Sequence, residues 1–177
     1  LPGNLNLQVR FRNEEKDGAR IFARGTTGGT GLFQFTPEPI NSTTMQLETT
    51  LGYTGDKLQI SSGYYGTSYD NHNTALNITE VGVATGLAGF TPIGLPPGNQ
   101  SHQLFLSGGY SFTPTTRGTF KAAYTQQTQN DAFILASAPG RTDLGGRIDT
   151  TLLQAGLTAR PLPKLSLLAN LRYEDRD

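Results

Sequence analysis

The stretch KLQISSGYYGTSYDN, residues 57–71, sets a pattern that the rest of the chain repeats. Successive side chains of an extended strand point to opposite sides. Leu58, Ile60 and Tyr64 therefore share an apolar face, while polar or small residues such as Gln59 and Gly63 occupy the other. The alternation predicts a strand with an apolar face backed by a polar face of small side chains.

The preceding segment, residues 43–54, alternates in the same way, and a tight turn at residues 53–56 joins the two segments into a hairpin. Each arm has about eleven residues, close to the roughly 9–11 that a tilted strand needs to cross a bilayer. Strands of soluble sheets average about five to six residues. The length therefore favours strands that cross a membrane.

The same alternation predicts seven strands, at residues 4–12, 43–54, 58–71, 101–112, 117–128, 150–159 and 164–173. Tight turns near residues 55, 114 and 162 alternate with long polar loops at residues 14–40, 71–100 and 129–148. Within the first loop, we expect residues 19–24 and 32–35 to form a small hairpin extension. Short turns at one end and long loops at the other are typical of outer-membrane barrels. We predict an all-β, antiparallel up-and-down meander that is a portion of a transmembrane outer-membrane β-barrel.

Aromatic residues favour the two ends of the predicted apolar faces, where an amphipathic ring is best placed at a membrane interface. Those near the tight turns are Tyr53, Tyr110 and Phe112, and those toward the loop end are Phe11, Tyr64, Tyr124 and Tyr173. This distribution predicts two interfacial girdles and a location in the bacterial outer membrane.

Composition excludes several other classes of protein. No apolar run approaches the roughly 18 residues of a transmembrane helix. Lys+Arg and Asp+Glu both number 14, so the net charge of zero gives no argument for nucleic acid. The absence of cysteine excludes disulfides and covalent haem attachment within this chain. We therefore expect no cofactor bound by the chain itself.

The sequence also lacks a recognisable catalytic or metal-binding constellation. His72 and His102 are the two histidines, and neither has neighbouring ligands at metal-binding spacing, so we expect structural roles for both. Ser101 and His102 are neighbours on a strand and point oppositely, which argues against a nucleophile pair. We predict that the chain is not an enzyme.

The chain, residues 1–177, is expected to be a single β-barrel segment of a longer barrel. Seven strands begin and end in the same direction, so they cannot close an all-antiparallel barrel alone. The first and last strands are also alike, because Leu5, Leu7, Phe11, Arg12 and Glu14 match Leu165, Leu167, Leu171, Arg172 and Glu174.

The predicted polar faces would line a wet or protein-filled lumen. The charged residues expected there are Arg10, Arg12, Glu48, Lys121, Arg160, Arg172 and Glu174. The cations among them are candidates for pairing with carboxylates of a docked protein through charge-assisted hydrogen bonds.

Three runs carry a family resemblance: LGYTGDKLQISSGYYGTSYDNHN, HQLFLSGGYSFTPTTRGTFKAAYTQQTQND and LLQAGLTARPLPKLSLLANLRYEDRD. They resemble the MtrB/PioB type of decahaem-associated outer-membrane β-barrel, most clearly from Thr44 onward. The resemblance implies a structural barrel that sheaths a periplasmic multihaem c-type cytochrome and positions it for electron transfer across the outer membrane. It adds an extracellular multihaem cytochrome as a further candidate partner, beside the lipid bilayer. The haem would belong to the partner, because cofactors, not their holder, carry redox chemistry. The resemblance then makes haem propionates of the docked cytochrome further candidates for pairing with Arg10, Arg12, Lys121, Arg160 and Arg172.

Two alternatives stay open at this point. A general porin or substrate channel would use the same polar lumen to pass solutes. A soluble β-sheet binding module would place the apolar faces inside and the polar faces in water.

Overall fold

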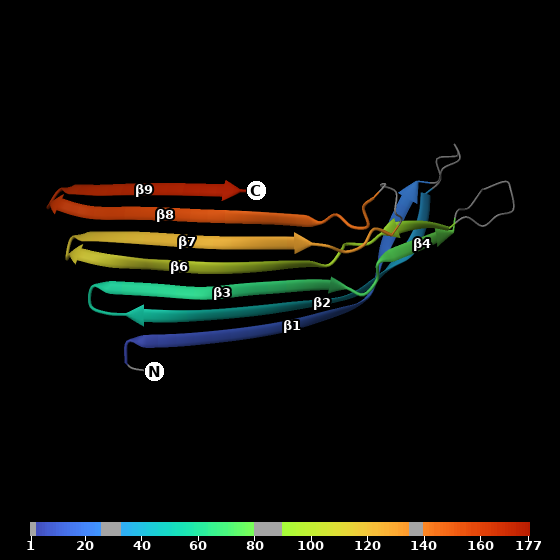
Figure 1. Ribbon diagram of the computed structural model, residues 1–177, viewed down its shortest axis with the longest axis horizontal. Coiled ribbons are helices and arrows are strands. Elements are labelled where there is room, and N and C mark those ends of the chain that lie inside the picture. The colour runs from blue at the N-terminus through green and yellow to red at the C-terminus, as the bar shows by residue number, and fades with distance from the viewer. Residues whose placement is uncertain (1–2, 26–32, 80–89, 135–139) are drawn as a thin grey trace.

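Figure 1 shows the computed structural model, which describes residues 3–25, 33–79, 90–134 and 140–177. No helix with the length and apolar character to span a bilayer occurs in these ranges. The regular elements are the strands β1 (Leu5–Gly25), β2 (Phe33–Thr54), β3 (Leu58–Asn71), β4 (Ala75–Thr79), β5 (Phe90–Gly94), β6 (Asn99–Thr113), β7 (Thr116–Gln129), β8 (Gly146–Leu162) and β9 (Leu165–Arg176).

Seven of these strands form one sheet in the order β1-β2-β3-β6-β7-β8-β9, with every neighbouring pair antiparallel. Tight turns join β2 to β3, β6 to β7 and β8 to β9 at one end of the layer, on the left of Figure 1. The longer connections lie at the opposite end. The predicted all-β antiparallel meander of seven long strands is therefore confirmed.

The prediction of a long loop at residues 14–40 is wrong. β1 continues unbroken to Gly25 and pairs with β2 from Leu5↔Tyr53 to Gly25↔Phe33. A strand with water on both sides needs no apolar face, so its polar residues resemble a loop in the sequence although they continue the ladder. The expected hairpin extension is confirmed over residues 19–24 and 33–35, which belong to the paired parts of β1 and β2. Residue 32 lies outside the described residues.

The second predicted loop, residues 71–100, contains a hairpin that the sequence did not reveal. β4 and β5 pair antiparallel from Ala75↔Gly94 to Thr79↔Phe90, and β4 contacts β2. Strands of five residues are too short to show a clear alternation. In the described part of the third predicted loop, residues 130–134 and 140–145, one bridge, Ala132↔Asp143, is formed, and β8 already begins at Gly146.

The β4–β5 hairpin packs on the extension of β1 and β2 beyond the other strands, residues 18–25 and 33–42. We call these two hairpins together the loop-end module. Leu76 and Ile78 of β4 are buried, as are Glu38 and Ser42 of β2. Glu38 and Ser42 belong to the polar face of β2, so β4 and β5 cover the continuation of that face.

Cross-strand register places the alternating residues of all seven strands on two common faces, because directly paired residues share a side. The apolar face carries Leu58 and Ile60 of β3, which pair with Tyr53 of β2 and with Tyr110 and Gly108 of β6. The polar face carries the residues between them. Both faces keep this assignment from β1 to β9.

The apolar band runs diagonally across the sheet. Its last aromatic residue toward the loops is Phe11 on β1 and Tyr173 on β9. The row of directly opposite residues that starts at Tyr173, however, reaches Leu7 on β1. The loop-end boundary of the apolar band is thus displaced by four residues along the strand direction between β9 and β1, which are six strand-to-strand steps apart. With about 3.3 Å per residue and about 4.8 Å between strands, this corresponds to a tilt of roughly 25°. Tilted strands are required to close a barrel.

Candidate functional site

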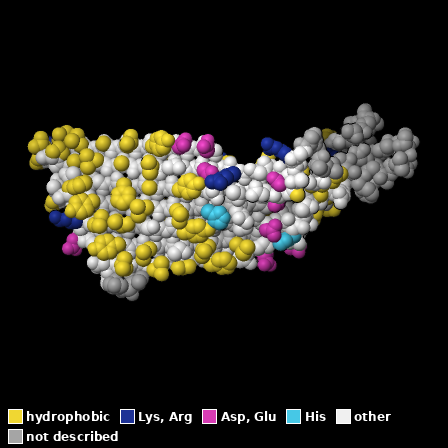
Figure 2. Space-filling view, in the orientation of Figure 1, with side chains coloured by type: hydrophobic (Ala, Val, Ile, Leu, Met, Phe, Trp, Pro, Cys, Tyr) yellow, Lys and Arg dark blue, Asp and Glu magenta, His cyan; other side chains and the backbone are white. Residues whose placement is uncertain are grey.

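The apolar face has exposed large side chains on six of its seven strands, and those of β3 are half-buried. Large side chains from all seven strands lie on it, and Leu171 of β9 has 71% of its surface exposed. Figure 2 shows them as a continuous apolar field over the tight-turn half of the sheet. A field of this extent meets a non-aqueous medium or a partner, because soluble monomers rarely expose apolar patches larger than a few hundred Å².

Polar and acidic residues close this apolar field at the loop end. The acidic residues on the same face are Glu15, Asp17, Asp70, Asp149 and Asp175. The hydroxyl of Tyr124 donates to Asp149 at 2.7 Å, and Tyr64 shares a hydrogen bond of 2.6 Å with His102 Nδ1. Figure 2 shows the acidic side chains beyond the apolar field. The tyrosines therefore have apolar rings in the field and hydroxyls among polar groups, as expected of an interfacial girdle.

The polar face is shallow because many of its side chains are small. Gly63 on β3 pairs with Phe105 on β6, and a Cβ added at Gly63 would lie 2.7 Å from the ring and would collide with the Thr49 carbonyl oxygen. On the apolar face, Phe120 lies across Gly108 in the same way. An aromatic ring over a cross-strand glycine covers backbone that would otherwise be open, which stabilises the pairing.

Charge is sorted between the two faces. The polar face of the strands carries ten cations, namely Arg10, Arg12, Lys16, Arg20, Arg24, Arg117, Lys121, Arg160, Arg172 and Arg176. It carries four carboxylates, namely Glu14, Glu38, Glu48 and Glu174. Among the described strands of the sheet, Arg147 is the single cation on the apolar face. The zero net charge of the sequence thus conceals a cationic polar face.

The predicted lumen-facing residues all lie on this polar face, but several neutralise one another. Arg10 pairs with Glu48 at 3.4 Å across β1 and β2. Arg12 pairs with Glu14 at 2.6 Å, and Arg172 pairs with Glu174 at the same distance. The two Arg-x-Glu pairs lie on β1 and β9, so the sequence similarity of the first and last strands is also a similarity of side-chain geometry.

Other cations on the polar face have neutral partners. The Arg160 Nε donates to Ser166 Oγ at 3.2 Å, and Lys121 makes no hydrogen bond or ion pair with any described residue. Sequence analysis missed Arg117, whose Nη2 donates to Gln59 Oε1 at 2.7 Å. Arg117 begins a predicted strand beside a tight turn, so its position in the sequence resembled a solvated turn residue. Its place on the same face as Lys121 was the available signal.

Two adjoining hollows follow from the small residues on the polar face. One, of about 380 Å³, is lined on this face by Thr119, Lys121, Gln154, Gly156, Asn170 and Arg172. The other, of about 580 Å³, lies over Gly52, Gln59, Ser61, Ser107, Gly109 and Arg117 and shares Thr119 with the first. The hollows carry three cations and no carboxylate between them. They can receive anionic groups.

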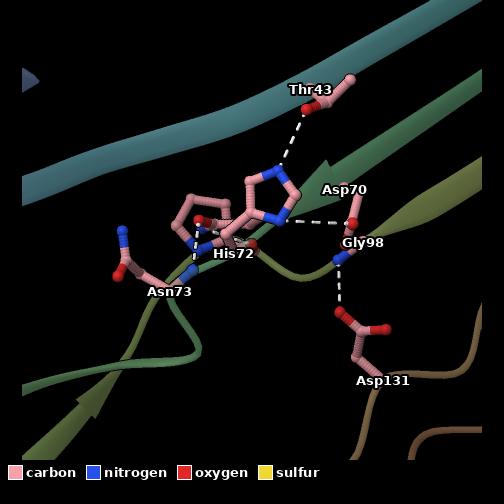
Figure 3. A network of polar contacts seen from close by, with 8 residues as sticks. Thr43, Asp70, His72, Asn73, Gly98 and Asp131 are labelled. Atoms are coloured by element: carbon pink, nitrogen blue, oxygen red, sulfur yellow. Dashed lines mark hydrogen bonds and ion pairs between the residues drawn. The ribbon is translucent and has the colours of Figure 1, made fainter. Parts of the chain in front are cut away.

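Each histidine shares a hydrogen bond with a residue of a neighbouring strand, His72 with Thr43 and His102 with Tyr64. Figure 3 shows His72 just after β3, where Nε2 lies 3.0 Å from Thr43 Oγ1 and Nδ1 lies 3.6 Å from Asp70. Nearby, the Gly98 N–H donates to the Asp131 carboxylate and connects the loops before β6 and after β7. No group of three or more His, Cys, Asp or Glu residues suited to a metal ion occurs in the described parts of the chain.

Comparison with known proteins identifies the sheet as a barrel wall. The family model for outer membrane beta-barrel porins of the MtrB/PioB type matches residues 2–177. The chain belongs to the MtrB/PioB family. Outer membrane protein MtrB of Shewanella baltica (strain OS185) is 26% identical over 177 residues, which cover 97% of this chain. The match covers 25% of that relative, so this chain spans a quarter of its length.

Solved structures agree on the fold. OmpT of Vibrio cholerae, folded in vitro, superposes with a TM-score of 0.56 at 17% identity and covers 98% of this chain and 42% of that one. Its loop L8 deletion mutant gives a TM-score of 0.56 at 17% identity, covering 99% of this chain and 45% of the mutant. Identity this low supports the fold alone. In this outer-membrane family member, the apolar face is the lipid-facing side and the polar face lines the lumen, which sets aside the soluble β-sheet module.

Proposed function

We propose that the chain is part of the wall of an outer-membrane barrel that sheaths a multihaem c-type cytochrome and positions it for electron transfer across the membrane. The observation that supports this most directly is the polar face, which is shallow, cationic and hollowed rather than filled by its own side chains. A wall of this kind leaves room for a docked protein. The family is one of structural barrels and not a class of enzymes.

The chain's own chemistry fits a holder better than a redox protein. It has no cysteine to attach a c-type haem. The barrel would contribute a lipid-compatible exterior, a polar interior and closure without open sheet edges, while electrons would pass along the partner's cofactors. At the loop end, an extracellular multihaem cytochrome is the second partner that this function implies.

Haem content of the purified full-length barrel tests the proposal. A tag on the barrel, detergent extraction of outer membranes and an absorbance scan should give c-type haem in fixed stoichiometry to the barrel. Because this chain has no cysteine, haem on a full-length barrel that likewise lacks haem-attachment motifs would have to belong to a bound cytochrome. A barrel purified without haem from cells rich in cytochromes would contradict the proposal.

An anion-selective channel is the second candidate, because the ten cations on the polar face would attract anions into an open lumen. Conductance in planar bilayers separates the two functions. A sheath should conduct poorly until its cytochrome is removed, whereas a channel should conduct as purified.

A further inference from the structure

Lumen cations differ between the two halves of the sheet. Toward the loop end, Arg10 lies 3.4 Å from Glu48, and Arg12 and Lys16 lie 2.6 and 3.1 Å from Glu14. Toward the tight turns of β7, β8 and β9, the cations Arg117, Lys121 and Arg160 have no carboxylate within ion-pair distance among the described residues. Arg176, at the loop end of β9, likewise has no ion pair among the described residues. Arg117, Lys121 and Arg160 are the three such cations that lie together on the adjacent strands β7 and β8, and we call them the cationic patch.

The patch has the shape of a receptor for anions. Arg117 lies across Gly109, where a Cβ would come within 2.9 Å of the guanidinium. In the neighbouring hollow, Lys121 and Arg172 flank Gln154 in one cross-strand row, and the position of Gly156 beside it has no side chain. Thr119 Oγ1 and Asn170 Oδ1 lie over Gly156, so the groups between the cations are small and polar. An incoming group can therefore approach the cations without meeting a bulky side chain.

The chemistry selects carboxylates as the groups that fit. A guanidinium binds a carboxylate through two parallel hydrogen bonds, and an ammonium adds a compact charge with three donors. Gln59 occupies one side of Arg117 with a neutral oxygen, which an anionic oxygen would outcompete. Spacing also matters, since Lys121 and Arg172 are two strands apart, about 10 Å at the backbone. That spacing suits several carboxylates spread over a protein surface.

We propose that the cationic patch is the docking surface for an acidic region of the cytochrome held in the lumen, with carboxylates of that protein, haem propionates included, seated in the two hollows. This inference rests on the proposed function and adds to it the charge of the partner's contact surface and the half of the barrel where contact is made. Charge complementarity is the reason for choosing this occupant, because charged surfaces that meet in a wet interface are arranged with opposite sign.

The experiment uses the full-length barrel, purified on a tag from cells that make the cytochrome. Three variants are compared with the wild type: Arg117→Glu/Lys121→Glu, the same pair with Arg160→Glu added, and Arg147→Glu as the matched control. Arg147→Glu makes one such charge reversal on the opposite, lipid-facing side of β8. The haem-to-barrel ratio is measured after washing at about 0.05, 0.15 and 0.5 M salt, since ionic contacts at a wet interface weaken as salt rises. Heat-modifiable migration of each barrel verifies assembly.

The expected result is graded. The double variant should lose cytochrome at a lower salt concentration than the wild type, the triple variant should lose most of it at the lowest salt, and Arg147→Glu should behave as the wild type. Assembled variants that keep the wild-type haem ratio at every salt concentration would overturn the docking surface and leave the sheath function intact. A wild-type barrel free of haem would overturn both. Equal loss from the Arg147→Glu control would also overturn the inference, because the effect would not depend on the lumen side.

Discussion

The seven-stranded wall and the loop-end module share β1 and β2, yet they bury side chains differently. In the module, Leu76 and Ile78 are buried against β2, and Ile78 is 2% exposed. In the described part of the wall, Ala123 is the one buried hydrophobic side chain, although the wall contains most of the large apolar residues. The module folds around a small core of its own, whereas the wall has its apolar residues on the outside.

The difference shows that the surrounding medium, not the strand, decides where apolar residues belong. Lipid is as apolar as a leucine side chain, so the wall needs no interior to bury its apolar face. Water surrounds the module, where the β4–β5 hairpin covers one side of the β1–β2 extension and buries Leu76 and Ile78. Ile21, Phe33 and Phe35 on the other side of the extension stay exposed. One continuous pair of strands can satisfy both conditions because its faces change character where it leaves the bilayer.

The largest effect should come from placing a charge on the lipid side of the wall. Leu106 lies on the apolar face of β6, between Ser62 of β3 and Ala122 of β7. Leu106→Arg should destabilise the folded barrel by about 2–4 kcal/mol, as expected for a cation near the bilayer midplane. Urea titration of the full-length barrel in lipid vesicles measures this change.

The adjacent residue supplies the matched control. Ser107 lies on the polar face of the same strand, between Ser61 and Lys121. Ser107→Arg should change stability by less than about 1 kcal/mol, because its side chain would enter an aqueous lumen. Equal losses for the two variants would contradict the assignment of the two faces.

The difference between wall and module also explains what the sequence could and could not predict. Alternation over residues 43–54 and 58–71 repeats often enough to fix strands, turns and the identity of the two faces. The alternation did not predict the strands within residues 14–40, because beyond Asn13 the lipid no longer requires an apolar face and the periodic signal disappears. It failed again for β4, whose five residues give too few alternations.

The lumen site was predictable in composition but not in pairing. The alternation placed Arg10, Arg12, Lys121, Arg160 and Arg172 on one face, as the register shows. Arg12 and Arg172 pair with glutamates two positions along their own strands. Whether Arg10 is neutralised depends instead on Glu48, which lies directly opposite on the next strand. The sequence of a single strand does not state its register with the next strand. The cationic patch could therefore be recognised only from the structure.

Truncation of the module core should have the next largest effect, but a local one. Ile78→Ala removes buried methyl groups and should cost about 2–3 kcal/mol, within the range for aliphatic core truncations. We expect faster hydrogen exchange in β4, β5 and residues 33–42 of β2, with unchanged exchange in β6 to β9. Asn77→Ala, at an exposed neighbouring position, is the control. Uniform acceleration across the sheet would mean that module and wall form one cooperative unit.

Two ion pairs on β1 and β2 extend the comparison to charged groups. In the module, Arg20 holds Glu38 through two hydrogen bonds of 2.9 and 2.6 Å, and the Glu38 side chain is 7% exposed. The hydrogen bond to Glu38 and its charge raise the pKa of the Arg20 guanidinium, so the guanidinium stays charged. Arg20→Ala would leave a covered carboxylate without its cation, which is costly. Protease cleavage in the module should accelerate several-fold, while Arg20→Lys should restore part of the protection.

The smallest effect is expected at the equivalent pair in the wall. Arg10 reaches Glu48 through one contact of 3.4 Å, and the Glu48 side chain is 40% exposed. Water in the lumen screens this pair, so Arg10→Ala should lower the free energy of unfolding by less than about 1 kcal/mol. The same urea titration in vesicles detects the change, and raising the salt concentration should reduce it further.

The contrast between the two pairs separates burial from charge as the source of stability. Both join an arginine of β1 to the glutamate directly opposite on β2, so strand position and chemistry are matched. If Arg10→Ala proved as damaging as Arg20→Ala, the lumen around Glu48 would have to be dry, filled by protein packed against the wall. Repeating the titration on a barrel stripped of any lumen protein would then decide the point, because removal of the filling should return the Arg10→Ala effect to the small value of a solvated pair.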